Sequence, residues 1–236
     1  MAWHETGEGR PLLLIHGLFS NARINWVKYG HAAKLAAGRR RVIMPDLRAH
    51  GDSAKPHDPS GFGDDVLADD MLALVSHLGL ETGAFDLGGY SLGARTAARM
   101  LVRGIRPGKA MLAGVGLEGL LNLGSRTDFF RKVLEGAGSH LKYSPEWLAE
   151  AFLKTSKGDP QSLLLLLDHF PAIPRAALIE LDLPILVLSG IEDRDNGSAK
   201  SLAALLPNAV LTEVPGNHMS AVTLPELGDA MVHWFC

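Results

Sequence analysis

The chain has a single cysteine, Cys236, and it is the last of the 236 residues. An intrachain disulfide is therefore impossible, and this cysteine usage favours a reducing compartment. The sequence also lacks any apolar run of about 18 residues, the length that a membrane-spanning helix needs. No charged stretch followed by an apolar stretch opens the chain, so we expect no secretory signal. These absences predict a cytoplasmic protein with no membrane partner.

The chain also lacks a large excess of charge of either sign. Lys and Arg number 23 against 26 Asp and Glu, a formal net charge of −3 at pH 7. Nucleic acids and anionic membranes attract markedly basic surfaces, so we expect neither as a partner. Hydrophobic residues, in contrast, make up 47% of the chain. A chain of this length can bury one sizeable core but is short for two, which predicts a single domain over residues 1–236.

Short apolar runs alternate with helical patterns along the chain. The predicted strands lie near 3–7 and at 11–17, 41–47, 84–87, 109–115, 184–190 and 209–216. The predicted helices lie at 28–37, 64–78, 95–103, 201–206 and 225–235. Continuous apolar strands are typical of a sheet that is buried on both faces. The alternation predicts an α/β fold with a mostly parallel, doubly wound sheet.

Residues 117–175 break this alternation. They carry three helical patterns, at Thr127–Glu135, Pro145–Lys154 and Gln161–His169, with glycines and prolines between and after them. Ligands bind outside the carboxyl ends of the strands in open α/β sheets. Helices inserted between two strands therefore predict a small helical lid over that edge of the sheet.

Gly89-Tyr90-Ser91-Leu92-Gly93 fits the pattern G-x-S-x-G and stands between a predicted strand and a predicted helix. The pattern alone is weak evidence, because the chain has 26 glycines. Between a strand and a helix, however, it forms a sharp turn that exposes the serine hydroxyl, and the glycines avoid side-chain clashes there. This context favours a nucleophilic Ser91 over a structural glycine turn.

A serine nucleophile needs a general base and an acid that orients the base. His218 follows the last predicted strand, and Asp193 follows the strand before it. We predict His218 as the base and Asp193 as the acid. Asp195, Glu192 and Glu118 are alternatives for the acid, since they also lie in or near loops that follow strands.

The chain order Ser91, Asp193, His218 is the order of the α/β-hydrolases, not that of chymotrypsin or subtilisin. With its G-x-S-x-G turn and its early strand ending in His16-Gly17, the chain resembles the serine-nucleophile branch of the α/β-hydrolase fold family. The likeness leaves only about residues 117–175 unplaced. It implies a serine hydrolase that cleaves a small ester, thioester or related acyl substrate through an acyl-enzyme intermediate. We expect neither a cofactor nor a metal.

The resemblance also implies an oxyanion hole built from two backbone N–H groups. One is that of Leu92, directly after the nucleophile, and the other belongs to the loop after His16-Gly17. In this loop we expect the N–H of Leu18 to be the second donor, with the N–H of Phe19 as the second choice. The His16 ring is expected to hydrogen-bond the loop backbone. Ala49 stands where the family's D-x-R-G-x-G-x-S loop usually has glycine.

The side chains of Phe19, Tyr90 and Trp147 are predicted to line the substrate pocket, since aromatic residues provide large apolar surfaces. The alternative is that these aromatic side chains only pack in the hydrophobic core. The small lid and the absence of an evident lipid-binding surface favour a modest acyl or ester substrate over a long-chain triglyceride. The sequence holds no signal for the oligomeric state.

Other reactions use the same triad. The resemblance leaves thioesterase, lactonase and C–C bond hydrolase open, whereas Ser91 argues against the branches with an aspartate nucleophile. The run from Gly89 to Arg95 also looks like that of a menaquinone-pathway lyase that eliminates pyruvate, in which Arg95, Arg126 and Arg131 would bind carboxylates. A further alternative is a non-enzymatic, ligand-binding member of the fold.

Overall fold

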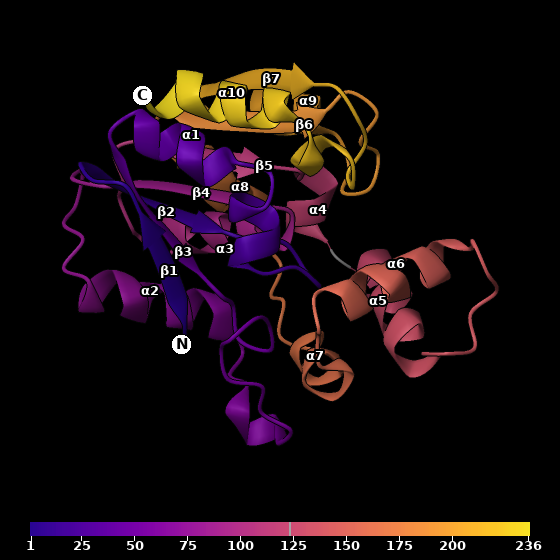
Figure 1. Ribbon diagram of the computed structural model, residues 1–236. Helices are drawn as coiled ribbons and strands as arrows, with labels where there is room; N and C mark the ends of the chain where they lie inside the picture. Colours follow the sequence, from indigo (N-terminus) through magenta and orange to yellow (C-terminus); the bar gives the residue numbers. More distant parts are fainter. Residues whose placement is uncertain (123) are drawn as a thin grey trace.

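The computed structural model describes residues 1–122 and 124–236, with the side chain of Ser125 left out. Residue 123, inside the predicted 117–175 segment, lies outside the described residues. Seven strands of the described residues form one sheet in the order β1-β3-β2-β4-β5-β6-β7 (Figure 1). They are β1 (Trp3–Thr6), β2 (Arg10–Ile15), β3 (Arg40–Pro45), β4 (Asp86–Tyr90), β5 (Ala110–Ala113), β6 (Ile185–Gly190) and β7 (Ala209–Val214). Only β1 pairs antiparallel in this sheet. The predicted α/β fold is therefore confirmed.

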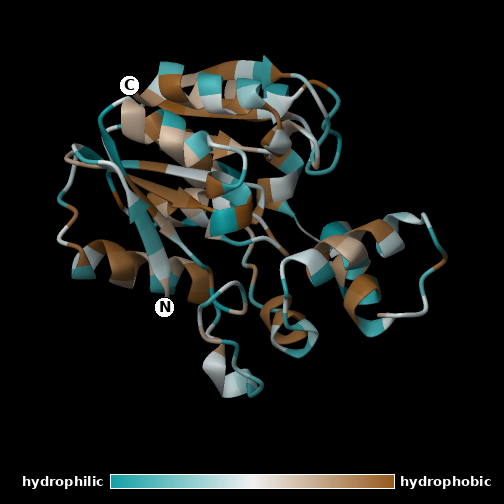
Figure 2. Cartoon of the chain, viewed as in Figure 1, coloured by the Kyte–Doolittle hydropathy of each residue, from teal (hydrophilic) through white to brown (hydrophobic). Residues whose placement is uncertain are grey.

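Helices cover both faces of the sheet, because the central strands are apolar on both sides. The side chains of β2 from Leu12 to Ile15 are all 0% exposed and alternate between the two faces. Those of Leu12 and Leu14 pack beneath α1 (His31–Ala37) and α10 (Pro225–Phe235). Their neighbours Leu13 and Ile15 belong to the core on the other face. That core includes α2 (Val66–His77), α3 (Leu92–Val102) and α9 (Ala199–Leu205). Figure 2 shows the central strands largely in brown, the colour of hydrophobic residues, whereas the edge strand β1 is hydrophilic.

One predicted helix begins later than expected. The pattern at 28–37 predicted a single helix, but α1 starts at His31, after Gly30 with φ +80°. A turn of π-helix at Arg23–Val27 precedes it. A left-handed residue cannot continue an α-helix, so Gly30 separates the two segments. Two short 3₁₀ turns, Pro59–Gly61 and Ala221–Thr223, complete the helical elements outside the segment between β5 and β6.

Five helices of the described residues, rather than the three predicted, lie between β5 and β6. They are α4 (Leu117–Leu121), α5 (Gly124–Glu135), α6 (Pro145–Thr155), α7 (Pro160–Leu166) and α8 (Arg175–Ile179). Figure 1 shows α5, α6 and α7 set apart from the sheet, whereas α4 and α8 lie against it. The starts of α6 and α7 are well defined, because Ser144 and Asp159 cap them and a proline occupies the first turn of each.

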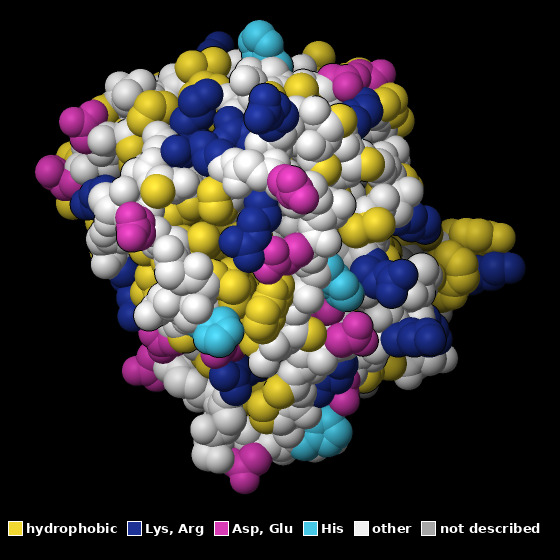
Figure 3. Space-filling view, turned by 60° about the vertical axis from the view of Figure 1, so that its left-hand side comes forward, with side chains coloured by type: hydrophobic (Ala, Val, Ile, Leu, Met, Phe, Trp, Pro, Cys, Tyr) yellow, Lys and Arg dark blue, Asp and Glu magenta, His cyan; other side chains and the backbone are white. Residues whose placement is uncertain are grey.

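In the part of the chain that the structure describes, no helix combines the length and the apolar character needed to cross a bilayer. One face of the molecule, shown in Figure 3, carries basic, acidic and hydrophobic side chains interspersed. Many of the charges in the fold are paired with an opposite charge. Asp86, for example, is 1% exposed and binds both Arg10 and Arg40.

Candidate active site

Ser91 occupies the turn between β4 and α3 and has φ +55° and ψ −114°. Positive φ is unfavourable for a residue with a side chain, so the turn must be held by its surroundings. Two glycines allow the close approach. A Cβ atom on Gly89 would lie 2.2 Å from the carbonyl carbon of Gly93, and one on Gly93 would lie 2.0 Å from the carbonyl oxygen of Ile15. A side chain at either position would therefore displace the turn that presents Ser91.

The structure brings Ser91, His218 and Asp193 into one hydrogen-bonded line. His218 Nε2 lies 3.0 Å from Ser91 Oγ. On the other side of the ring, His218 Nδ1 lies 2.8 Å from Asp193 Oδ2. A carboxylate beside Nδ1 holds the proton on that nitrogen, which leaves Nε2 free to accept the serine proton. These distances are those of a nucleophile, a base and an orienting acid.

Asp193 sits in the loop after β6 and is 8% exposed. Burial raises the pKa of its carboxyl, but the hydrogen bond and the charge of His218 lower it, and so does the N–H of Asp195, which donates to Oδ1 at 3.0 Å. The net effect is a pKa below the usual value for aspartate. Asp193 is therefore ionised at neutral pH, and its negative charge lies where it could stabilise a protonated His218 ring.

None of the three alternative acids hydrogen-bonds His218, and two of them, Glu118 and Asp195, have other partners. Glu118 on α4 accepts a hydrogen bond of 2.7 Å from the backbone N–H of Ser198. The Asp195 carboxylate lies 3.4 Å from Arg126 Nη2 on α5. Glu192 is exposed. Of the four acidic residues considered from the sequence, Asp193 alone has a carboxylate in contact with the histidine ring.

The backbone N–H groups of Leu18 and Leu92 lie near Ser91, and neither has a hydrogen-bond acceptor among the described residues. Leu92 is the first residue of α3, where backbone N–H groups have no partner within the helix and carry partial positive charge. Phe19, the second choice for the oxyanion hole, is engaged elsewhere, since its N–H donates to His50 Nε2 at 3.2 Å. Of the two candidates in the loop after His16-Gly17, Leu18 therefore has the free N–H, and Leu92 has a free N–H directly after Ser91.

Two buried histidines fix the loop that carries Leu18. His16 Nε2 accepts the N–H of Leu47 at 3.0 Å, so its Nδ1 carries the proton and donates to the carbonyl of Gly17 at 2.8 Å. His50 likewise accepts at Nε2 and donates from Nδ1 to the carbonyl of Arg48 at 2.9 Å. Both rings must be neutral to make these contacts.

Burial supports the same protonation state. It is the main cause that lowers the pKa of His16, and it lowers the pKa of His50 to about 3, with the nearby His16 adding to the effect. The sequence pointed to the structural role of His16. It did not point to His50, whose partner Phe19 lies 31 residues away in the chain.

The predicted substrate-pocket residues take three different positions. The Phe19 ring is 2% exposed, lies edge-on to Phe130 and borders a cavity at Ser91. Tyr90 also borders a cavity, but its hydroxyl donates to the carbonyl of His218 at 2.6 Å. Burial raises the pKa of this phenol, so it remains a donor. Tyr90 therefore supports the turn that carries His218.

Trp147 does not fit its predicted place. The residues of α6 that border the cavity at Ser91 are Pro145, Leu148, Ala149 and Phe152, which share one face of the helix. Trp147 lies on the opposite face by the helical repeat of 3.6 residues, and its ring packs edge-on against Tyr143. The aromatic residue of α6 at the pocket is Phe152, which also borders the second cavity at Ser91.

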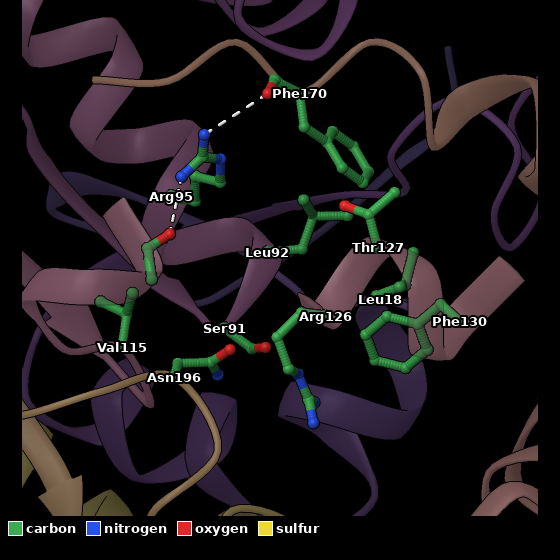
Figure 4. Close-up of a pocket in the computed structure, with 11 residues that line it drawn as sticks. Leu18, Ser91, Leu92, Arg95, Val115, Arg126, Thr127, Phe130, Phe170 and Asn196 are labelled. Carbon is green, nitrogen blue, oxygen red and sulfur yellow. Dashed lines mark hydrogen bonds between the residues drawn. The ribbon is translucent and has the colours of Figure 1, made fainter. Parts of the chain in front are cut away.

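Three cavities of the described residues meet at Ser91 and Leu18. The smallest, about 40 Å³, lies toward Leu92, Val115 and Thr127 and is drawn in Figure 4. A second, about 210 Å³, lies toward Ile24 and Val222. The third, about 300 Å³, lies under α5 and α6. His218 borders the two larger cavities and is absent from the lining of the smallest.

Arg95 borders the smallest cavity but faces neither solvent nor an acid. The residue is 4% exposed, and its guanidinium donates to the carbonyls of Gly119 at 2.6 Å, Leu120 at 2.9 Å and Pro171 at 2.5 Å. Figure 4 shows a fourth, longer contact with the carbonyl of Phe170. Burial lowers the pKa of Arg95 to about 10, so the side chain stays charged at neutral pH. Both terminal nitrogens of the guanidinium, Nη1 and Nη2, therefore donate to backbone carbonyls.

One cluster of the described residues offers several metal-ligand atoms: His4, Asp46 and Asp52. The buried Asp46 already accepts two backbone hydrogen bonds of 2.8 Å, from Ala22 and from Asp52. These contacts tie the loop after β3 to the segment that follows the oxyanion loop. They account for the buried carboxylate without an ion, so Asp46 acts as a brace for this part of the site.

Comparison with known families and relatives gives a consistent result. The family described as alpha/beta hydrolase fold matches residues 10–156, more than half of the chain. One similar protein is the dihydrolipoyllysine-residue acetyltransferase component of an acetoin-cleaving system from Pseudomonas putida. It is 35% identical over 128 residues, which cover 52% of this chain and 32% of that protein. A soluble epoxide hydrolase from Corynebacterium is 38% identical over 81 residues, covering 34% of this chain and 26% of that protein. The matches thus span about a third of these relatives or less.

Solved structures with the same fold cover nearly the whole chain. A thermophilic esterase from Thermogutta terrifontis has a TM-score of 0.77 and 25% identity, over 99% of this chain and 92% of that one. A marine microorganism esterase has a TM-score of 0.79 over 100% of this chain and 98% of that one. Its identity is 20%, so this second likeness shows the fold alone.

Proposed function

Since the chain belongs to the alpha/beta hydrolase fold family, we propose that it is a serine hydrolase of small neutral esters, thioesters or related acyl compounds. The observation that carries the proposal is the unbroken line of contacts from Ser91 Oγ through the His218 ring to Asp193. The two unpaired N–H groups beside Ser91 support it, because an acyl-transfer reaction develops negative charge at such a position.

The first half of the reaction acylates the enzyme. Ser91 Oγ attacks the carbonyl carbon while His218 Nε2 takes the hydroxyl proton. The carbonyl oxygen becomes an oxyanion and accepts hydrogen bonds from the N–H groups of Leu18 and Leu92. Asp193 stabilises the imidazolium at Nδ1. The tetrahedral intermediate then collapses, His218 donates its proton to the departing alkoxide, and an ester of Ser91 remains.

The second half regenerates the serine. A water molecule gives its proton to His218 Nε2 and attacks the acyl carbon, and the same two N–H groups stabilise the new oxyanion. Collapse of this intermediate returns the proton to Ser91 Oγ and releases the carboxylic acid. In this proposal, the two halves together use the substrate, one water molecule and residues of this chain.

The surroundings of Ser91 favour a neutral substrate. The two larger cavities are bordered mainly by apolar side chains, among them Ile24, Val222 and Phe152. We also propose that α5, α6 and α7 act as a small lid within a single domain of residues 1–236, since α5 and α6 supply one wall of the largest cavity. The partner is then a small molecule that enters between this lid and the strand ends.

The contacts of Arg95 and Arg131 offer no support for the pyruvate-eliminating lyase. That reaction needs guanidinium groups that bind substrate carboxylates. Arg95 is occupied by backbone carbonyls, and Arg131 lies 2.5 Å from Asp168. Arg126 does border two of the cavities at Ser91, and its buried Nε has no hydrogen-bond partner among the described residues. It lies 3.4 Å from Asp195, however, and a single arginine is not the set of guanidinium groups that the lyase would use. A C–C bond hydrolase would use the same triad. It is the runner-up, since a 2-hydroxymuconate semialdehyde hydrolase from Pseudomonas is 32% identical over 42% of this chain.

Labelling and turnover test the proposal together. A fluorophosphonate probe should label the wild-type protein and leave Ser91→Ala unlabelled. Ser91→Ala should also reduce the hydrolysis of p-nitrophenyl acetate by about 10³-fold or more, because the triad acts as a unit. Circular dichroism serves as the folding control. A folded Ser91→Ala that keeps a tenth of the wild-type turnover would rule out the serine mechanism. A wild-type protein that is not labelled would favour the ligand-binding alternative.

A further inference from the structure

The position of His218 divides the cavities at Ser91 into two functional sides. Three groups surround the carbonyl carbon of a bound ester: the carbonyl oxygen, the acyl chain and the leaving alcohol. The oxygen must face the N–H groups of Leu18 and Leu92. The alcohol oxygen must face His218 Nε2, because the nitrogen that takes the serine proton also donates it to the leaving group. The acyl chain is left to occupy the remaining direction.

That direction leads into the smallest cavity. Its lining includes Leu18, Ser91 and Leu92 but not His218, so it meets the nucleophile and both oxyanion donors without meeting the general acid. Figure 4 shows Leu92, Val115 and Thr127 arranged around this space beside Ser91. We call it the acyl lobe.

The two larger cavities both border His218 and so lie on the leaving-group side. They also share Phe152 and Met219, which stand at their common boundary. The cavity of about 210 Å³ extends past Ile24 and Val222, and the one of about 300 Å³ extends below α5 and α6. We call these two cavities together the leaving-group lobe.

The difference in size between the lobes determines which half of the substrate is large. The acyl lobe holds about 40 Å³. A water-sized group needs about 10–15 Å³ on this measure, so the lobe accepts about three heavy atoms beyond the carbonyl carbon. Two parts of its wall resist widening, whereas Arg126 and Phe130 form a part that also borders the cavity of about 300 Å³. Val115 is 4% exposed, and the buried Arg95 is fixed by the carbonyls of Gly119 and Leu120.

We infer that the natural substrate joins a short acyl group, from acetyl to butyryl in size, to a larger apolar alcohol. The inference rests on the proposed function and adds the orientation of the substrate to it. It excludes the opposite arrangement, a long acyl chain on a small alcohol, as a good substrate. Val115 and Thr127 then act as determinants of acyl size, and Ile24 and Val222 as determinants of the alcohol.

Two substrate series separate the lobes. In p-nitrophenyl acetate, butyrate and octanoate only the acyl chain changes. We expect kcat/KM to fall by about tenfold or more from butyrate to octanoate, because a chain that does not fit is excluded. In ethyl, hexyl and 2-phenylethyl acetate only the alcohol changes, and these alcohols are similar in acidity. Here kcat/KM should rise by about tenfold from ethyl to the larger alcohols.

A matched pair of variants assigns each preference to its lobe. Val115 borders the acyl lobe and Val222 the leaving-group lobe, so Val→Ala makes the same chemical change in each. Val115→Ala should raise the octanoate-to-acetate ratio of kcat/KM several-fold and leave the alcohol preference alone. Val222→Ala should alter the alcohol preference and leave the acyl preference alone. Should Val115→Ala not fold, Thr127→Leu on the partly exposed face of α5 narrows the lobe and should lower butyrate turnover more than acetate turnover.

The outcomes distinguish this inference from the function on which it rests. Octanoate hydrolysed as well as acetate would overturn the assignment of the lobes and leave the esterase intact. Exchanged effects of the two valine variants, or no effect of either, would do the same. If no ester in either series showed Ser91-dependent turnover, the proposed function would fail and the inference with it.

Discussion

Asp193 and Asp195 lie two residues apart in one loop, yet their carboxylates have different partners. Asp193 contacts His218 Nδ1 at 2.8 Å, whereas the Asp195 carboxylate faces Arg126 at 3.4 Å. Asp193→Asn should lower the kcat for p-nitrophenyl acetate by about 10⁴-fold, the loss given by the corresponding change in serine proteases, because it favours the wrong imidazole tautomer. Asp195→Asn keeps the backbone N–H that donates to the Asp193 carboxylate, so it should lower kcat far less.

The two aspartate variants control for one another, since each makes the same small change in the same loop. Equal thermal unfolding temperatures would show that folding is unaffected in both. If Asp195→Asn were the more damaging variant, the acid would be misassigned. Glu118→Gln extends the comparison, because Glu118 contacts the backbone of Ser198 and not the histidine.

At the residue scale, the sequence was most informative where a motif fixes the local backbone. Ser91 could be identified because G-x-S-x-G between a strand and a helix permits one kind of turn. Trp147 could not be placed, because the face on which a helical residue lies depends on where the helix packs. The contact between His50 and the Phe19 N–H joins residues 31 positions apart, and no local pattern signals such a contact.

At the element scale, Arg95 joins three segments. It extends from α3 and donates to carbonyls of α4 and of the stretch that follows α7. Arg95→Met keeps much of the apolar stem but removes every donor. We expect a loss of about 2–4 kcal/mol in the free energy of unfolding, because an unsatisfied buried acceptor costs about 1–3 kcal/mol. Urea unfolding at pH 7 measures the difference.

Arg95→Lys is the matched control for this prediction. A lysine keeps the charge but not the planar fork that reaches several carbonyls at once, so an intermediate loss of stability is expected. Unchanged unfolding of Arg95→Met would contradict the role as a structural clamp. It would return Arg95 to the set of residues available for a substrate carboxylate.

The helices show which element boundaries a sequence can define. The starts of α6 and α7 can be read from the sequence, because a capping side chain followed by proline is typical of a helix start. The two pairs are Ser144-Pro145 and Asp159-Pro160. The five-residue helices α4 and α8 were missed, since one turn is too short for a periodic pattern. The π-helical turn before α1 depends on contacts made elsewhere in the fold.

At the scale of the whole molecule, the fold was predictable because several independent signals agree. Apolar strands, alternating helices and the chain order of Ser91, Asp193 and His218 all indicate the same arrangement of a parallel sheet. The cavities were not predictable, since each is formed by segments far apart in the chain. Ile24, Val222 and Phe152 border one cavity at Ser91 although they come from three separate parts of the sequence.

Stability as a function of pH is a property of the whole molecule that its buried histidines determine. Burial is the main cause that lowers the pKa of His16, His31 and His50, the last to about 3. Below a pH of about 6.5 the histidines of the unfolded chain bind protons, whereas these buried rings of the folded protein do not. The free energy of unfolding therefore decreases as the pH is lowered. Each such ring contributes a slope of about 1.4 kcal/mol per pH unit. For His50 the loss continues until the pH nears 3.

His50→Gln isolates one of these rings. A glutamine oxygen can still accept the N–H of Phe19, as His50 Nε2 does, but cannot be protonated in the unfolded chain. We expect the variant to lose stability about 1.4 kcal/mol per pH unit less steeply than the wild type between pH 6 and pH 4. Urea unfolding at half-unit steps measures the slope. The exposed His233→Gln is the control and should match the wild-type slope. If the free energies of unfolding of His50→Gln and the wild type changed equally with pH, His50 would have to bind its proton in the folded protein as well. That result would contradict the hydrogen bond in which His50 Nε2 accepts the Phe19 N–H.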